Sequence, residues 1–393
     1  MAQPMGLTLD DIVFDEATPE QQRIALELRA EACPTPDEFI ERERHLTEHE
    51  LTRSSRRQWV LYLKGYPRQI IASCEATRQK ILVADGTARE AYGYTIRHVF
   101  TAPVWRRLGM AAYLLQYVKE RMDEDSECSV FFSDSGREYY TGLGWLPYQG
   151  KQANLILLSW PQSPPLTPLE SPPQSPQGEV CQRPRAPSFS YRPTGLIDPV
   201  TVDLLRLEDL PWLCKQDNYQ LSARFKDMPP SKKTHVAFAP TYARLEWQLA
   251  RAEFDAVRMT GKTITYKGAR TGNSRSWLYW AHDIPAKKLR ILRIVHGADC
   301  QTAAQRVADV QVLLEAALAE AKEWSLPRVV LWNPDEEIVT GCKAVGNRNT
   351  ASVKVVFDQQ MGGCVPSLRW KPSEPGEPRR VIEWEDNYGY CLP

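Results

Sequence analysis

The alternation of hydrophobic and polar positions along the chain predicts a mixed α/β protein. In the first part of the chain we expect strands at residues 7–14, 59–63, 69–74, 80–83, 94–100 and 129–132. A helix is expected over residues 18–33, because Thr18 can cap it, Pro19 suits its first turn and Gln21 completes a capping box. Strand, helix, antiparallel strands, then strand, loop, helix, strand and helix is the predicted order.

The segment that follows the strand at 94–100 predicts an anion-binding site. Ala102-Pro103 ends the strand, an R-x-x-G-x-A segment follows, and an apolar helix face begins at Ala111. The N–H groups and the dipole of a helix start attract an anion, and a glycine lets the backbone approach it closely. A pyrophosphate fits this segment better than a lone carboxylate. The residues concerned are Arg106, Arg107, Leu108, Gly109, Met110, Ala111 and Ala112.

The residues that follow this segment make the R-x-x-G-x-A motif a more specific signal. A second apolar strand ends in Ser133-Asp134-Ser135-Gly136, and a short helix carrying Tyr139 and Tyr140 closes on Gly144-Trp145. With these motifs the chain resembles the GNAT superfamily of acetyl-CoA-dependent N-acetyltransferases. The array "IRHVFTAPVWRRLGMA" and "CSVFFSDSGREYYTGLGW" is similar to the fungal lysine N-acetyltransferases of the Lyc type. It departs from them at Arg97-His98, Ser135 and Tyr139.

The resemblance implies roles for individual residues. It implies that the loop at 106–112 binds the pyrophosphate of CoA, and that main-chain groups of Val99, Phe100 and Thr101 hold the pantetheine arm and polarise the acetyl carbonyl. It implies that Tyr140 is the general acid that protonates the CoA sulfur; a phenol with a pKa near 10 keeps its proton at neutral pH. Ser133 is expected to contact the pantetheine or a bound water, although a serine also suits a turn.

The general base stays open at this level. The position at which the family often has a glutamate is Thr95, which cannot act as a base. His98 lies on the same strand and has a suitable pKa, but strand alternation predicts that it faces the side opposite Thr95. Glu75 is an alternative, and so is a C-terminal acid such as Glu385 or Asp386. Water is a further alternative, since an amine with a pKa near 10 is partly deprotonated at equilibrium.

The composition of the chain predicts two domains and a linker. Residues 1–160 are expected to form the GNAT acetyltransferase domain, and residues 161–193, rich in Pro and Ser, an extended linker. Residues 194–393 contain strands at 277–282, 289–295 and 328–332 around a long amphipathic helix. This order predicts a second, degenerate GNAT-like α/β domain on the substrate side. Its loop at 297–302 carries Asp299 where CoA phosphates need bases, so we expect it not to bind CoA.

Charge and cysteine usage exclude several function classes. The 49 basic and 49 acidic residues balance, which predicts neither nucleic acid nor a membrane as partner. The nine cysteines show no metal-binding spacing, so we expect no metal, reduced thiols and a cytoplasmic location. The first residues lack the pattern of a secretory signal, and no apolar run is long enough for a membrane helix. The oligomeric state is left open.

The sequence therefore predicts an acetyl-CoA-dependent N-acetyltransferase that uses direct transfer in a ternary complex, because no cysteine occupies a nucleophile position. By resemblance the acceptor is the side-chain amine of free lysine or a related small amine. A secondary-metabolite intermediate or a protein lysine is the alternative acceptor. A CoA-binding regulatory protein without catalysis is the alternative from another class. A nucleotide-binding P-loop is excluded, because no Gly-Lys-Ser/Thr follows Gly109.

Overall fold

The computed structural model describes residues 8–133, 137–158, 188–191, 200–298, 300, 302–358, 365–372 and 380–388. The chain divides into two compact units, each assembled from separate stretches of sequence. Unit 1 contains residues 1–151, 212–254 and 359–393, and unit 2 contains residues 152–211 and 255–358. The chain therefore does not divide at the linker, where the composition predicted the boundary.

Unit 1 is built on a nine-stranded sheet, whose main path runs in the order β1-β2-β3-β4-β5-β16-β6. Near its far end β3 also pairs with β10, which in turn pairs with β17. Neighbours on the main path are antiparallel except for β4 and β5. Its strands are β1 (Ile12–Glu16), β2 (Arg56–Leu63), β3 (Tyr66–Ala84), β4 (Ala88–Thr101), β5 (Cys128–Ser133), β6 (Leu146–Pro147), β10 (Lys233–Phe238), β16 (Val365–Trp370) and β17 (Val381–Trp384).

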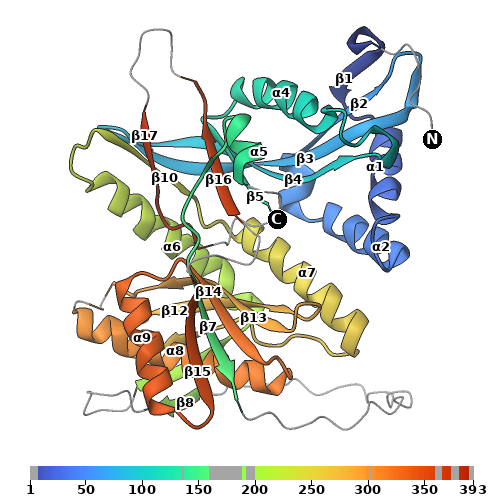
Figure 1. Cartoon of the computed structure of the whole chain (residues 1–393). Coiled ribbons are helices and arrows are strands. Elements are labelled where there is room, and N and C mark those ends of the chain that lie inside the picture. The colour runs from blue at the N-terminus through green and yellow to red at the C-terminus, as the bar shows by residue number, and fades with distance from the viewer. Residues whose placement is uncertain are drawn as a thin grey trace, which may run out of the picture. The chain divides into compact units, whose positions relative to one another are not determined.

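Helices cover both faces of this sheet (Figure 1). On one face α4 buries Leu114, Leu115 and Val118 against a core that includes Trp59 and Ile96. On the other face α1 packs its apolar side over the sheet. The helices of this unit are α1 (Pro19–Ala30), α2 (Pro36–Thr47), α3 (Glu50–Ser55), α4 (Met110–Asp123), α5 (Arg137–Gly142), α6 (Leu210–Lys226) and the first part of α7 (Tyr242–Thr260), with 3₁₀ turns η1 (Leu9–Asp11) and η2 (Pro103–Trp105).

Unit 2 has its own eight-stranded sheet in the order β15-β7-β14-β13-β12-β11-β9-β8. Within it, α8 is buried along most of its length and packs against α9 and several strands. The elements are β7 (Gln152–Leu157), β8 (Ser188–Tyr191), β9 (Val200–Leu205), η3 (Leu207–Asp209), β11 (Gly268–Thr271), β12 (Trp277–Asp283), β13 (Lys288–Val295), α8 (Ala303–Glu323), β14 (Arg328–Trp332), α9 (Glu336–Arg348) and β15 (Val353–Asp358).

The two sheets exchange one strand each. β7 directly follows β6 in sequence, yet it lies between β14 and β15 in the sheet of unit 2. β16 directly follows β15 in sequence, yet it lies between β5 and β6 in the sheet of unit 1. In both cases, the strand that comes just before in the sequence belongs to the other sheet.

Most of the predicted elements are confirmed. Thr18 caps α1, and its hydroxyl accepts from the N–H of Gln21 while the Gln21 side chain accepts from the N–H of Thr18. The strands expected at 277–282, 289–295 and 328–332 and the long helix between the last two are present. Three predictions are wrong in detail: 69–74 and 80–83 belong to one long strand, residues 9–11 form a 3₁₀ turn, and residues 188–191 of the expected linker form β8.

A chain that ends after residue 158 is expected not to fold. It would lack β16 from the interior of the unit 1 sheet, so β5 would become an edge whose buried residues, such as Val130, face water. Circular dichroism and soluble yield of this fragment test the prediction. Co-expression with a second fragment, residues 188–393, is expected to restore soluble protein. A folded, monomeric 1–158 fragment would show that unit 1 tolerates the loss of β16.

Candidate functional site

The start of α4 has the geometry of an anion-binding site. Arg107 and Gly109 have φ values of 63° and 78°, so the chain enters the helix through two left-handed residues, with Gly109 as the N-cap. Among the described residues, the hydrogen bonds between backbone groups of loops and helix caps include none donated by the N–H groups of residues 107–112. The helix dipole adds partial positive charge at the same end. The local structure predicted for residues 106–112 is thus confirmed.

The two arginines of this loop differ in their surroundings. Arg106 Nε donates to the carbonyl oxygen of Thr101 at 3.1 Å, and the guanidinium lies 5.9 Å from the centre of the Phe100 ring. This contact ties the loop to the end of β4. Arg107 is exposed and forms no ion pair with any described residue. Arg107 therefore remains available to a bound anion.

The β4–β5 ladder ends before the strands do. The two strands pair in parallel from Gly93 to Thr95, although β4 continues to Thr101. On its other side β4 stays paired with β3, where Phe100 lies opposite Ser73 and Thr101 opposite Ala72. The edge of β4 that faces β5 thus has backbone groups outside this ladder near Val99–Thr101.

A β-bulge interrupts β4 at His98. Ser73 pairs with Phe100 and Glu75 with Arg97, so two residues of β4, His98 and Val99, lie opposite Cys74 alone. His98 has a φ of 54°, which is rare for a residue with a side chain. The bulge inserts one residue into the strand and resets its alternation.

This bulge overturns the predicted orientation of His98. Strand alternation placed His98 on the face opposite Thr95, but the extra residue turns its ring to the same face. Thr95 accepts from Gln79 there at 2.6 Å, and the His98 ring approaches Glu75, which shares that face of β3 with Gln79. Val99 packs into the core on the other face.

Tyr140 lies on that second face. Its ring, on α5, packs against Phe131 with 4.1 Å between ring centres. Burial raises the pKa of Tyr140 above its ordinary value, and a hydrogen bond with Ser133 opposes this only in part. Cys74, which lies opposite the bulge, belongs to the same buried cluster as Tyr140. Ser133, Tyr140 and the bulge are therefore brought together, whereas Ser135 and Gly136 lie outside the described residues.

Sequence reasoning missed a buried network of charges beside His98. Glu75 is fully buried and contacts Arg29 of α1 at 2.7 Å and Arg97 of β4 at 3.0 Å. Arg97 also donates to Glu43 of α2 at 3.2 Å. Four elements supply these four residues, so no spacing in the sequence could reveal the network. The presence of charged residues in predicted strands was the available signal.

The proposed C-terminal acids have other partners. Glu385 lies 2.8 Å from Nδ1 of His235 on β10, and Asp386 lies 2.6 Å from Arg224 on α6. Neither pair includes a residue of the His98 network. The structure thus does not bring Glu385 or Asp386 together with the predicted site.

In unit 2 the corresponding loop is occupied by its own side chains. Thr302 caps α8 by accepting from the N–H of Gln305 at 3.1 Å. The fully buried Asp309 accepts from the hydroxyls of Ser274 and Ser276. A carboxylate in this position disfavours a bound phosphate. Asp299 itself lies outside the described residues.

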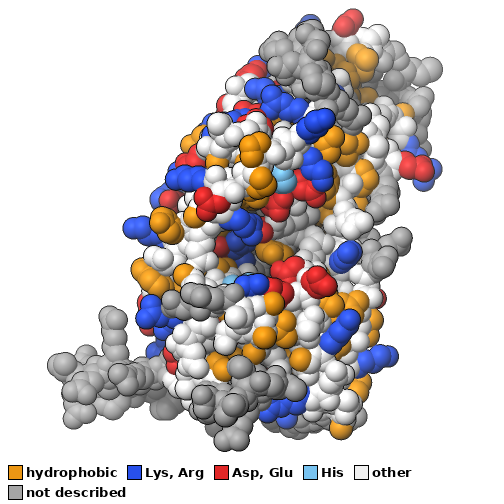
Figure 2. All heavy atoms as spheres, turned by 90° about the vertical axis from the view of Figure 1, so that its left-hand side faces the viewer, with side chains coloured by type: hydrophobic (Ala, Val, Ile, Leu, Met, Phe, Trp, Pro, Cys, Tyr) orange, Lys and Arg blue, Asp and Glu red, His pale blue; other side chains and the backbone are white. Residues whose placement is uncertain are grey.

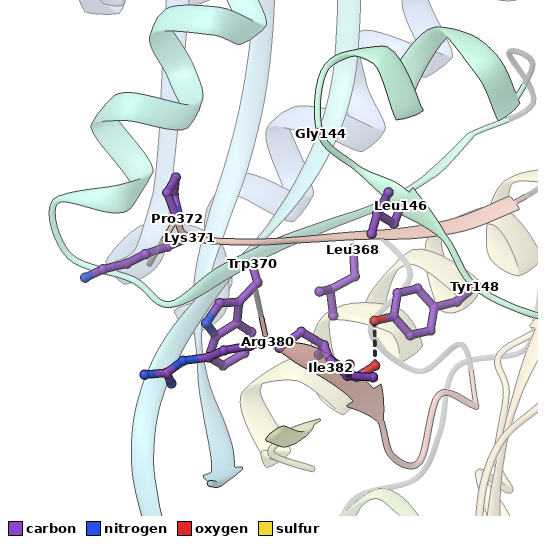
Figure 3. A pocket seen from close by; sticks show the side chains of 10 residues that line it. Gly144, Leu146, Tyr148, Leu368, Trp370, Lys371, Pro372, Arg380 and Ile382 are labelled. Carbon is purple, nitrogen blue, oxygen red and sulfur yellow. Dashed lines mark hydrogen bonds between the residues drawn. The ribbon is translucent and has the colours of Figure 1, made fainter. Parts of the chain in front are cut away.

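A separate cavity of about 550 Å³ opens beside β16 and β17 (Figure 3). It is lined by Gly144, Leu146, Tyr148, Leu368, Trp370, Lys371, Pro372, Arg380, Val381 and Ile382. The Tyr148 hydroxyl donates to the carbonyl oxygen of Ile382 at 3.0 Å across one end. None of the residues predicted to bind CoA or to catalyse transfer lines this cavity, so we assign it no part in the reaction.

The remaining surface and cysteine features are unremarkable for chemistry. Basic and acidic side chains are interspersed over the face in Figure 2, in keeping with a net charge of zero. The six described cysteines are free thiols. Among the described residues, no three His, Cys, Asp or Glu side chains form a group that could hold a metal ion. In the same residues no helix is both long and apolar enough to cross a membrane.

Comparison with known proteins places the fold and the family. Two solved structures share the fold at a TM-score of 0.50. Each alignment covers 91% of this chain and 72% of the chain in the solved structure. They are a probable N-acyltransferase from Enterococcus faecalis, 11% identical, and a GCN5-related N-acetyltransferase from Anabaena variabilis, 13% identical. No curated protein matches the chain by sequence. The family described as the LYC1 GNAT-like C-terminal domain matches residues 188–392, more than half of the chain. The chain therefore belongs to the LYC1-like family of GNAT N-acetyltransferases.

Proposed function

We propose that this enzyme transfers the acetyl group of acetyl-CoA directly to a primary amine in a ternary complex. One observation carries the proposal. The bulge in β4 puts His98 on one face of the sheet, while Tyr140 packs on the other face in the same buried cluster as Cys74 and Val99, which lie at the bulge. A base and an acid thus flank the end of the β4–β5 ladder, and the anion-binding start of α4 follows β4 in sequence.

The reaction follows from these positions. His98 accepts a proton from the ammonium form of the substrate, and the neutral amine nitrogen then attacks the acetyl carbonyl carbon. The nitrogen loses its second surplus proton to solvent as the amide forms. The C–N bond forms, the C–S bond breaks, and Tyr140 donates its proton to the sulfur so that CoA leaves as a thiol. Solvent takes the proton from His98 and returns one to Tyr140. Main-chain groups of Val99–Thr101 would polarise the carbonyl, and residues 106–112 would hold the pyrophosphate.

His98 suits the role of base better than Glu75. Burial lowers the pKa of His98, and the neighbouring Arg97 lowers it further, so the imidazole is neutral at pH 7 and can accept a proton. Burial would raise the pKa of Glu75, but Arg97 and Arg29 outweigh it and hold that pKa well below its usual value. A carboxylate with so low a pKa is a poor proton acceptor.

For the acceptor we propose the side-chain amine of free lysine or a related small amine, on the strength of the family. We further propose that the C-terminal half shapes the acceptor side, while the loop of unit 2 binds no CoA. In support, α7 places Trp247 within 4.9 Å of the Arg97 guanidinium, next to His98. Residues from the second half of the sequence thus reach the surroundings of the base inside unit 1. A cytoplasmic location fits the free thiols.

A screen of free amines with acetyl-CoA, read as release of CoA thiol, tests the function. Lysine and close analogues are expected to give the highest kcat/KM. His98→Asn is expected to lower kcat by about 10²–10⁴-fold, the usual span for a general base. Thiol release with protein lysines alone would move the acceptor to that class. CoA binding without thiol release from any amine would favour a non-catalytic CoA-binding protein.

A further inference from the structure

The His98 ring lies beside one carboxylate of its network, and the buried Nδ1 has no hydrogen-bond partner among the described residues. Its Nδ1 lies 3.5 Å from Oε1 of Glu75, and the Phe39 ring on α2 packs edge-on at 6.2 Å between ring centres. A catalytic hydrogen bond is often this long before substrate binds. Because Nδ1 faces the carboxylate, Nε2 is the nitrogen left for a substrate. About a quarter of the His98 side chain is exposed, whereas Glu75 is fully buried.

Glu75 cannot change its charge or its position easily. Arg29 and Arg97 approach it at 2.7 and 3.0 Å, and Arg56 adds a third guanidinium at 3.6 Å. Arg97 is held in turn by Glu43 at 3.2 Å and by the face of the Trp247 ring. Removing one partner from a buried charge network is costly, so the carboxylate is fixed from several elements at once.

We propose that Glu75 is the positioning residue of His98: its carboxylate accepts a hydrogen bond from Nδ1–H and so fixes the tautomer whose Nε2 lone pair takes the proton of the amine. This inference rests on the proposed role of His98 as base. Glu75 also stabilises the imidazolium that forms when His98 is protonated. A triad of His and Asp uses a carboxylate in the same way, but here the base lies on a strand bulge and the carboxylate on the neighbouring strand.

The charges around His98 set the sign of the expected pH effect. Arg97 on its own strand lowers the His98 pKa, while Glu75 of β3 and Glu43 of α2 raise it. Arg29 of α1 and Arg56 of β2 act on Glu75 rather than on His98 directly. Replacing the Glu75 carboxylate by an amide removes a negative charge beside the ring. The His98 pKa should therefore fall further, and the acid limb of kcat/KM should move to lower pH.

The first test needs no substrate. In wild-type protein labelled with ¹⁵N histidine, the neutral His98 ring is expected to carry its proton on Nδ1, and the spectrum of His98→Asn identifies its signals among the six histidines. A proton on Nε2 would overturn the proposal. This measurement decides even if a Glu75 variant fails to fold. It also separates the two proposals. Full activity of His98→Asn would contradict the role of His98 as base, whereas the tautomer measured for wild-type His98 would still stand.

The second test is Glu75→Gln, which keeps the size of the side chain. We expect kcat to fall by up to about 10⁴-fold, the loss caused when the carboxylate of a Ser-His-Asp triad becomes an amide, and the acid limb to shift downward. Glu385→Gln is the matched control, since Glu385 contacts Nδ1 of His235 at 2.8 Å outside the network. This variant should change neither kcat nor the position of the acid limb. A folded Glu75→Gln enzyme with reduced kcat, but with an unmoved acid limb, would assign Glu75 a merely structural role.

Discussion

Tyr140→Phe is expected to lower kcat by about 10²–10⁴-fold while the affinity for CoA changes little. The substitution removes only the hydroxyl, so the ring still packs against Phe131 and the fold is kept. Burial raises the pKa of Tyr140, so the phenol keeps its proton at physiological pH and would serve as the donor to the leaving thiolate in the proposed reaction. Steady-state kinetics with acetyl-CoA, together with calorimetry of CoA binding, measure both quantities.

Tyr139→Phe serves as the control, because Tyr139 precedes Tyr140 on α5 and is 44% exposed. It should retain nearly full activity. If Tyr139→Phe were the damaging change, Tyr139 rather than Tyr140 would be the general acid. An undiminished Tyr140→Phe enzyme would mean that solvent protonates the sulfur.

Gly109→Asp is expected to weaken CoA binding by about 10²-fold or more. Two like charges 4 Å apart repel by about 4 kcal/mol at an effective dielectric constant of 20, and solvent at this exposed loop reduces that value. The backbone should tolerate the change, since Asp can adopt the left-handed conformation of Gly109 and a Cβ there meets no atom within 4 Å. Calorimetry with CoA gives the affinity.

Two further variants separate charge from shape. Gly109→Asn has the same size without the charge and should lose much less affinity. Gly65→Asp introduces the charge at a turn with a similar φ of 80° and equal space, and should bind CoA normally. Equal losses for Asn and Asp at position 109 would indicate a steric effect and would contradict an anion at the start of α4.

Local patterns in the sequence predicted the parts of the site that depend on neighbours along the chain. The N-terminus of α4, with Gly109 as its cap, follows from the glycine, the preceding proline and the apolar period of the helix. The Thr18 capping box is likewise local. The placement of Ser133 near Tyr140 follows from a strand, a turn and a short helix in succession. In each case the physical cause lies within a few residues.

Tertiary structure alone decided three other features. The bulge at His98 depends on how β4 pairs with β3, and without it alternation gives the wrong face for the ring. The network around Glu75 joins residues from α1, α2, β2, β3 and β4, and its charges are tolerated only because each is buried beside an opposite charge.

The exchange of β7 and β16 is the third such feature. Strand propensity marks each segment as a strand but does not name its partner, since ladder hydrogen bonds join any two backbones that meet in register. The sequence by itself therefore determined most of the elements, the local structure of the loop at 106–112 and the family resemblance of this chain. The choice of partner for each strand, and with it the orientation of the His98 ring, was decided only when burial brought distant segments together.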